Sequence, residues 1–151
     1  MIAVDTPAGL LDVVGQHATA EGWFTVDQAR IDAFADTTDD HQWIHVDPVR
    51  AVAGPFGATV AHGYLTLSLI PALTRGLVEV GGAGLVVNYG LDRVRFLQPV
   101  TAGSRIRATS AVTSAEPTPQ GVRAGFTITV EIEGATKPAL IAETVVLYVA
   151  A

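Results

Sequence analysis

The sequence predicts an α+β domain in which a curved antiparallel sheet wraps around one long, central apolar helix. Residues 64–80 have a helical pattern that is apolar on nearly every face. Beyond Gly82 the chain shows strand patterns separated by turn residues. Because strands and helices do not alternate along the chain, the sequence excludes a parallel sheet built from β-α-β units.

The helix of residues 64–80 is predicted to be the centre of the fold. Its apolar side chains are Leu65, Leu67, Leu69, Ile70, Leu73, Leu77 and Val78. A helix of this composition must be covered by protein on most sides. Pro71 cannot donate a hydrogen bond to the carbonyl of Leu67, so we expect a kink near that turn. Gly81 and Gly82 are expected to end the helix.

Four strands are predicted after the helix. The clearest is 126–133, where apolar residues alternate with threonine and glutamate. Similar patterns cover 85–98, 104–114 and 140–149, and the simplest arrangement is an antiparallel meander. Two strands that would then be neighbours carry alternating arginines, which are Arg93, Arg95, Arg105 and Arg107. These could bind the phosphates of a coenzyme A or carrier-protein arm, although a solvated sheet face is the simpler interpretation.

One short helix and a long irregular segment precede the apolar helix. Thr25 and Gln28 fit a capping box, and apolar residues recur at helical spacing from there to Asp36. Residues 37–63 are rich in turn-forming types. Within them, Asp47 and Pro48 have the pattern of a helix cap followed by proline at the first helical position. We expect this helical and loop segment to overhang the sheet, and such long irregular segments are usually functional.

Composition excludes several classes of protein. The 151 residues fit one domain, taken here as residues 1–151, and with 49% hydrophobic and 16% charged residues the chain is not a disordered one. The net charge of -6, with one lysine and eight arginines, argues against nucleic-acid binding. The lack of cysteine excludes disulfides and thiol chemistry. No apolar run reaches the roughly 18 residues of a membrane span and no basic leader is evident, so a cytoplasmic location is expected.

Asp40 and His45 are the candidate acid-base pair. They stand five residues apart in the irregular segment, and a carboxylate with an imidazole suits proton transfer. Loop aspartates also cap helices and satisfy backbone donors, so the residues alone leave both interpretations open. The spacing of His41 and His45 would suit zinc on a helix, but no clear helix is predicted there, and we expect no metal.

Gly63 is the candidate donor to an oxyanion. It directly precedes the apolar helix, where backbone N–H groups lack helical acceptors. Gly63 could equally serve close packing at the start of the helix. Aromatic residues that could line an acyl pocket, or simply pack in the core, are Trp43, Phe56, Tyr64 and Tyr89.

The irregular segment resembles a known family. Its motif reads Asp40-His41-Gln42-Trp43-Ile44-His45, and it is followed by Gly54-Pro55-Phe56-Gly57 and by Ala61-His62-Gly63-Tyr64-Leu65. With the strand at 94–100, these residues resemble the (R)-specific enoyl-CoA hydratases of the MaoC-like group. More narrowly, the chain is similar to the NodN-like actinobacterial branch of 3-hydroxyacyl-thioester dehydratases. Gln42 and Trp43 replace the commoner asparagine and proline, and Asp39 stands where glycine is frequent.

The resemblance implies a hot-dog fold, a long helix rolled in an antiparallel sheet. It also implies reversible hydration of trans-2-enoyl thioesters to (R)-3-hydroxyacyl thioesters, in fatty-acid or other lipid metabolism. By position, Asp40 and His45 become the pair that activates water, and Gly63 becomes the oxyanion donor. Four neighbouring residues are expected to bind substrate, namely Gln42, Trp43, His62 and Tyr64.

The resemblance further implies a substrate carried by coenzyme A, or by an acyl carrier protein, and a homodimer without a cofactor. Two other functions stay open on the sequence. One is an acyl-CoA thioesterase, in which the activated water attacks the carbonyl carbon. The other is a non-catalytic module that binds acyl thioesters or a carrier protein.

Overall fold

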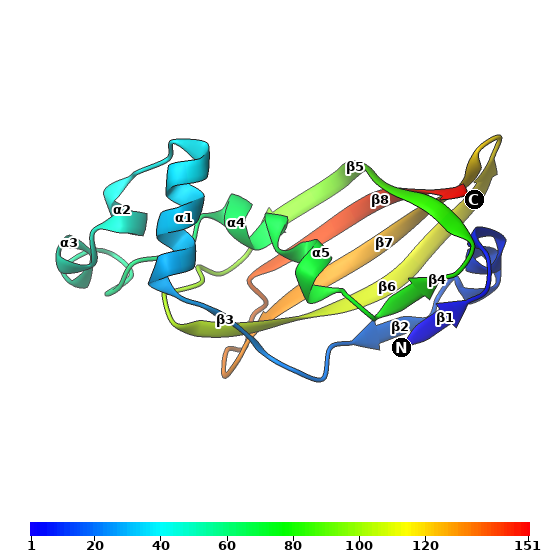
Figure 1. The fold of residues 1–151 in the computed structure, drawn as a ribbon. Coiled ribbons are helices and arrows are strands. Elements are labelled where there is room, and N and C mark those ends of the chain that lie inside the picture. The colour runs from blue at the N-terminus through cyan, green and yellow to red at the C-terminus, as the bar shows by residue number, and fades with distance from the viewer.

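A six-stranded antiparallel sheet forms the body of the protein in the computed structural model, which describes all 151 residues (Figure 1). Its strands are β2 (His17–Thr19), β3 (Phe24–Val26), β5 (Ala83–Phe96), β6 (Ser104–Thr118), β7 (Gly121–Ile132) and β8 (Leu140–Ala150). The order across the sheet is β2-β6-β7-β8-β5, and β3 also pairs with β6. A separate parallel pair joins β1 (Ile2–Val4) to β4 (Val78–Val80).

The predicted meander is correct for three of its four strands. β6, β7 and β8 are consecutive neighbours, but β5 pairs with β8 at the far edge instead of with β6. The edge of β6 is instead occupied by the short strands β2 and β3. The proposed stripe of four arginines is therefore wrong. Arg105 forms an ion pair with Glu133, just after β7, and Arg107 with Glu131 of β7, whereas the other two arginines lie on β5.

The central helix is shorter than predicted and is broken. It consists of α4 (Gly63–Ser68) and α5 (Ile70–Leu73), with Leu69 between them. The interruption next to Pro71 confirms the predicted kink. Proline lacks the N–H that would continue the helical series of backbone hydrogen bonds. The expected end at Gly81 is wrong. Gly76, at φ 76°, turns the chain, and the apolar residues that follow form strand β4 instead.

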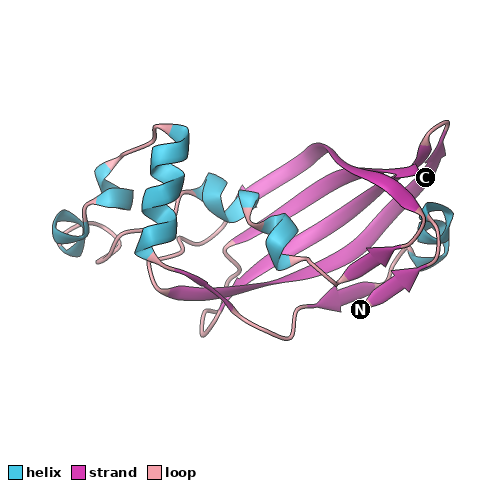
Figure 2. Ribbon diagram, in the orientation of Figure 1, coloured by secondary structure: helices cyan, strands magenta, loops and turns pink.

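The inner face of the sheet packs against α4 and α5, as Figure 2 shows. Inward residues alternate along β7 as predicted, since Phe126, Ile128 and Val130 are buried. The helices contribute Leu65, Leu69, Ile70 and Leu73 to the same hydrophobic cluster. A curved sheet around a helix is the predicted architecture. The two short helices, α4 and α5, extend along only part of the sheet.

Three helices overhang one end of the sheet (Figure 1). They are α1 (Gln28–Thr38), α2 (Trp43–Val46) and α3 (Pro48–Val52). The capping box predicted for α1 is wrong, because Asp27 caps it by accepting a hydrogen bond from the Arg30 amide at 2.9 Å. The predicted cap of α3 is confirmed, with Asp47 accepting from the Arg50 amide at 3.0 Å. The turn of helix at α2 was not predicted.

A 3-10 helix (Pro7–Val13) packs against β6 and β7, and its Leu10 is fully buried. None of the helices has the length and apolar character needed to cross a bilayer.

Candidate active site

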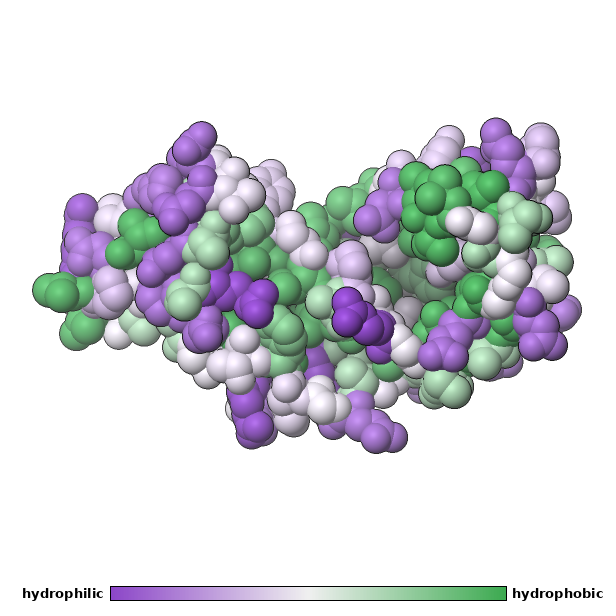
Figure 3. Space-filling model, viewed as in Figure 1, coloured by the Kyte–Doolittle hydropathy of each residue, from purple (hydrophilic) through white to green (hydrophobic).

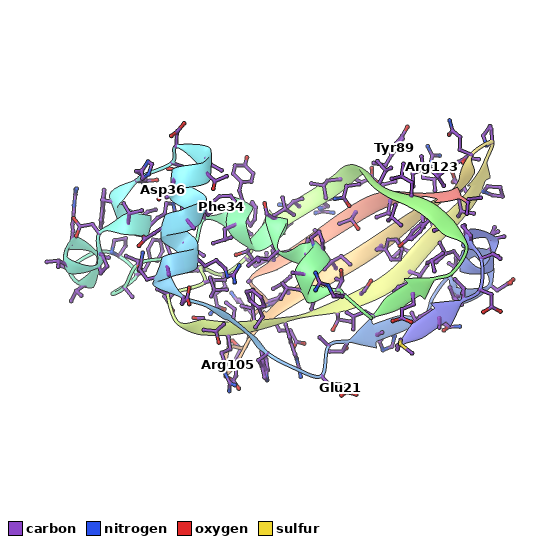
Figure 4. All side chains as sticks on the ribbon, viewed as in Figure 1. Glu21, Phe34, Asp36, Tyr89, Arg105 and Arg123 are labelled. Atoms are coloured by element: carbon purple, nitrogen blue, oxygen red, sulfur yellow. The ribbon has the colours of Figure 1, made fainter.

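Asp40, His45 and His62 converge where the overhang meets the start of α4. One nitrogen or oxygen atom from each residue lies within 4.8 Å of the others. Phe34, labelled on α1 in Figure 4, borders the group with its ring 5.0 Å from that of His62. The predicted acid-base pair is therefore brought together, with a second histidine beside it.

Asp40 is placed by the way α1 ends. Asp39, the C-cap of α1, has a left-handed backbone with φ 58°, a conformation that costs little for glycine and more for other residues. This explains why glycine is frequent at that position in the resembling family. The chain then turns, and the Asp40 carboxylate, whose side chain is 53% exposed, faces the two imidazoles. Its Oδ1 accepts a long hydrogen bond from the Gln42 amide at 3.4 Å.

His45 is buried on α2 in a defined tautomer. Its Nδ1–H donates to the Val60 carbonyl at 2.6 Å. A carbonyl can only accept, so the hydrogen lies on Nδ1 and Nε2 keeps its lone pair. Burial is the largest influence and lowers the pKa of His45 below its ordinary value. The hydrogen bond to Val60 opposes this in part, the nearby His62 lowers the pKa further, and Asp40 has the smallest, raising effect. His45 is therefore neutral at neutral pH and presents an acceptor nitrogen.

His62 contacts both members of the pair. Its Nε2–H donates to the backbone carbonyl of Asp40 at 2.9 Å, and the same nitrogen lies 3.9 Å from the Asp40 carboxylate. Its ring stacks on that of His45, with centroids 3.7 Å apart and an interplanar angle of 22°. His62 is only 3% exposed, and its buried Nδ1 has no hydrogen-bond partner in the protein. Its geometry suits holding Asp40 and His45 in place better than touching a substrate.

Gly63 meets the geometric requirements of both interpretations made from the sequence. It begins α4, and its N–H has no acceptor within the protein. A Cβ at this position would lie 3.1 Å from the Phe96 ring. Because glycine has no Cβ, Phe96 can pack closely against it. Tyr64 follows with a side chain 71% exposed, set edge-on to Phe96 at 6.2 Å. A free backbone donor thus directly follows His62, the residue that contacts both members of the acid-base pair.

Gln28 is a supporting residue that the sequence did not reveal. From α1, its Nε2 donates to the His45 carbonyl at 2.7 Å and to Asp32 at 2.8 Å, while its Oε1 accepts from the Thr59 hydroxyl. The Val60 amide donates to the Ile44 carbonyl at 3.0 Å. The sequence predicts a capping role for Gln28, and no local pattern distinguishes that role from a long-range contact.

Gln42 and Trp43 serve the turn itself. The Gln42 carbonyl accepts from the His45 amide at 2.9 Å, and the Gln42 amide donates to Asp40 Oδ1 at 3.4 Å, so its backbone makes these bonds to the acid-base pair. Trp43 is the first residue of α2, a position where proline is also favoured, so replacing proline leaves the helix start intact. Its ring lies 4.2 Å from the Arg50 guanidinium and borders Gly54.

The site is poorly shaped for a metal ion. His41, suggested by its spacing to His45, instead contacts Asp36 at 2.8 Å. The other histidine pair is stacked, with the planes of His45 and His62 nearly parallel. Because an imidazole binds a metal in its own plane, two stacked rings cannot both direct lone pairs at one ion.

Comparison with known proteins identifies the family. Residues 11–134 match the MaoC like domain. The chain belongs to the MaoC-like family. It is 48% identical over 151 residues to the 3-hydroxyacyl-thioester dehydratase Z of Mycobacterium tuberculosis (strain ATCC 25618 / H37Rv), covering 99% of this chain and 100% of that protein. Nodulation protein N of Rhizobium leguminosarum bv. viciae is 44% identical over 137 residues, covering 89% and 85%.

A solved structure gives the same assignment. The (R)-hydratase from A. caviae is 26% identical, with a TM-score of 0.73, and the match covers 89% of this chain and 96% of that one. The sequence-based prediction of a MaoC-like hot-dog fold is therefore confirmed.

Proposed function

We propose that this MaoC-like protein catalyses the reversible hydration of trans-2-enoyl thioesters to (R)-3-hydroxyacyl thioesters. The observation that carries the proposal is the clustering of two hydrogen-bond acceptors, the Asp40 carboxylate and the His45 ring, with His62, which the free N–H of Gly63 directly follows. The names of the mycobacterial dehydratase and the A. caviae hydratase support the same chemistry.

Water is the reactant that fits the two acceptors. A water molecule donates one hydrogen to the Asp40 carboxylate and the other to Nε2 of His45, which leaves an oxygen lone pair free. That oxygen bonds to the β-carbon as the carbon-carbon π bond opens, and Asp40 takes the released proton as general base. A proton then passes to the α-carbon. Because His45 begins neutral, it can be the acid for this step only after the proton that Asp40 took from the water has passed to Nε2 of His45. The other hydrogen of the water stays on the new hydroxyl.

Gly63 supplies the stabilising donor. Opening the double bond shifts negative charge onto the thioester oxygen, and the Gly63 N–H has no competing acceptor in the protein. Dehydration follows the same path backwards. Of the residues expected to bind substrate, exposed Tyr64 is suited to contact the thioester arm, whereas His62 acts as a positioning residue and Gln42 and Trp43 shape the turn.

An apolar cavity suits the acyl chain. It has a volume of about 550 Å³ and lies between the central helices and the inner face of the sheet. Leu67 is the first residue along the chain that lines it. Leu67 is one helical turn beyond Gly63. Figure 3 shows the molecule hollowed on this face, with apolar side chains along the border. We assign the acyl chain to this cavity and the thioester to the Gly63 end of it.

We further propose that two copies pair through β5. This edge strand has 14 residues and exposes large apolar side chains, including Leu85, Val86 and Tyr89. Long apolar edge strands are normally protected, because their unpaired backbone groups invite another strand. A second copy would extend the sheet and cover these residues.

The test is hydration of trans-2-enoyl-CoA followed by the loss of conjugated-thioester absorbance, with chiral analysis of the product. Asp40→Asn should lower kcat by roughly 10²-fold or more, because it removes the base. Asp36→Asn is the matched control, since Asp36 contacts only exposed His41. Near-normal turnover by Asp40→Asn would overturn the assignment of the base. Release of free thiol by the wild type would overturn the hydratase assignment and favour a thioesterase.

A further inference from the structure

Two buried hydroxyl groups line the acyl cavity without a partner in the protein, and the more exposed side chains of Thr144 and Asn88 line it as well. Ser110 is 2% exposed and Tyr148 is 9% exposed, and both line the cavity. Neither hydroxyl makes a hydrogen bond to another protein group. The Tyr148 ring packs edge-on to Phe126 at 6.4 Å, and burial raises the pKa of its hydroxyl, so the group stays a neutral donor.

The strand register places the two hydroxyls at different depths. Ser110 is opposite Ile128, which is opposite Ala142 of β8. Ala142 is two residues from Leu140, the partner of Phe96, whose ring contacts the catalytic end at Gly63. Tyr148 lies six residues beyond Ala142 on β8, about 20 Å along the strand. Ser110 is therefore near the reacting end of the cavity, and Tyr148 is at its far end.

A cavity for a plain alkyl chain would be better lined by alanine and phenylalanine at these positions. Both hydroxyls reach the water of the cavity, since His62 Nδ1 is the only fully buried side-chain polar atom without a partner. A plain alkyl chain that displaced this water would leave them without hydrogen bonds, which costs free energy. The neighbouring inward positions on β6 are apolar, namely Ala108 and Val112. No charged side chain is buried in the cavity, since Arg75 at its border is exposed. The two hydroxyls thus match a ligand oxygen that carries no charge.

We infer that the preferred acyl group carries a neutral oxygen function, a hydroxyl or a carbonyl, on the part of the chain remote from the thioester, and that Tyr148 binds it at the far end of the cavity. Ser110 binds an oxygen closer to the reacting carbons. The inference rests on the proposed function, and it names the class of thioester that the site favours.

Purified protein tests this with pairs of trans-2-enoyl-CoAs of equal chain length, one plain and one hydroxylated at the terminal carbon. Across short, medium and long chains, the ratio of kcat/KM for the hydroxylated to the plain substrate should rise to about tenfold at the length that reaches Tyr148. A ratio near one at every length means that only water occupies the hydroxyls, and this overturns the inference while the proposed function stands. No turnover of any substrate overturns the proposed function itself.

Variants locate the effect. Tyr148→Phe should bring the ratio for terminally hydroxylated chains back toward one, and Ser110→Ala should do so for chains hydroxylated nearer the thioester. Tyr89→Phe is the matched control, because this tyrosine is 60% exposed on β5 and does not line the cavity. Unchanged ratios in both cavity variants, or a terminal carboxylate preferred over the hydroxyl, would overturn the assignment.

Discussion

The stacked imidazoles of His45 and His62 set the chemistry of the site at the scale of single residues. Each ring donates to a backbone carbonyl, His45 to Val60 and His62 to Asp40. These bonds fix both tautomers and orient the lone pair of His45 Nε2 for water. Burial, with the neighbouring ring as a lesser cause, lowers the pKa of His45 below 6.5, so the proposed water site keeps its acceptor at neutral pH.

The pH profile should report this environment. Because the folded pKa of His45 is below 6.5, the acid limb of kcat/KM should have its midpoint below pH 6.5. The same shift means that the unfolded state binds more protons, so stability should fall as the pH drops from 6.5 through the folded pKa. His62→Gln should move the acid limb toward 6.5, because it removes one cause of the lowering.

His41→Gln is the control for this experiment, since His41 contacts only Asp36 outside the site. An acid limb centred at or above 6.5 in the wild type would contradict a neutral, buried His45. An unmoved limb in His62→Gln would show that the second ring does not influence the first.

Gly63→Ala should lower kcat by about 10²-fold, because the new methyl group meets Phe96 and displaces the N–H donor. Phe96 is 51% exposed and can be removed without opening the core. The double variant with Phe96→Ala should therefore recover part of the loss, which kinetics of the four proteins in a double-mutant cycle would measure. Full activity in Gly63→Ala would remove the donor from the mechanism.

At the scale of elements, helix caps and turns determine where the catalytic groups stand. α1 begins at the Asp27 cap and ends in the left-handed Asp39, and its Gln28 is tied to α2 through the His45 carbonyl. The overhang is therefore joined to the site at both ends of α1. Its stability should depend on Asp27, not on the capping box expected from Thr25.

Asp27→Ala should lower the free energy of unfolding by about 1 kcal/mol, because the Arg30 amide loses its acceptor. Urea denaturation would measure this loss. Thr25→Ala is the comparison, since Thr25 lies in β3 with an exposed side chain and caps nothing. A larger loss in Thr25→Ala than in Asp27→Ala would restore the capping box.

Local patterns predicted the features that depend on local sequence. Alternation located β7 and the other long strands, and the Asp40 to His45 motif with Gly63 gave the residues that the structure brings together. Pairing partners were not predictable in this way, because periodicity shows which face of β5 is apolar but not whether β6 or β8 lies beside it. Leu77, Val78 and Val80 were predicted to continue the helix, and their local pattern does not exclude the short strand that β4 forms. Gln28 and His62 act through contacts that only the folded chain creates.

At the scale of the whole molecule, a single chain leaves the long apolar edge of β5 exposed to water. We expect a homodimer in light scattering at micromolar concentration. Leu85→Lys should shift the protein toward monomers, because it places a charge on the apolar edge. Val49→Lys, on α3 at a position 88% exposed, should leave the dimer intact. A monomeric wild type would contradict pairing through β5.

The groups assigned to the reaction and their supports lie in one stretch, from Gln28 to Gly63, which precedes the long strands. The groups that line the acyl cavity all come later, from Leu67 to Tyr148. Reactivity and substrate choice are thus inherited as two adjoining blocks of sequence. A lineage can exchange or diversify the second block while the first stays constant, so relatives of this protein can acquire new acyl preferences without rebuilding the machinery that adds and removes water.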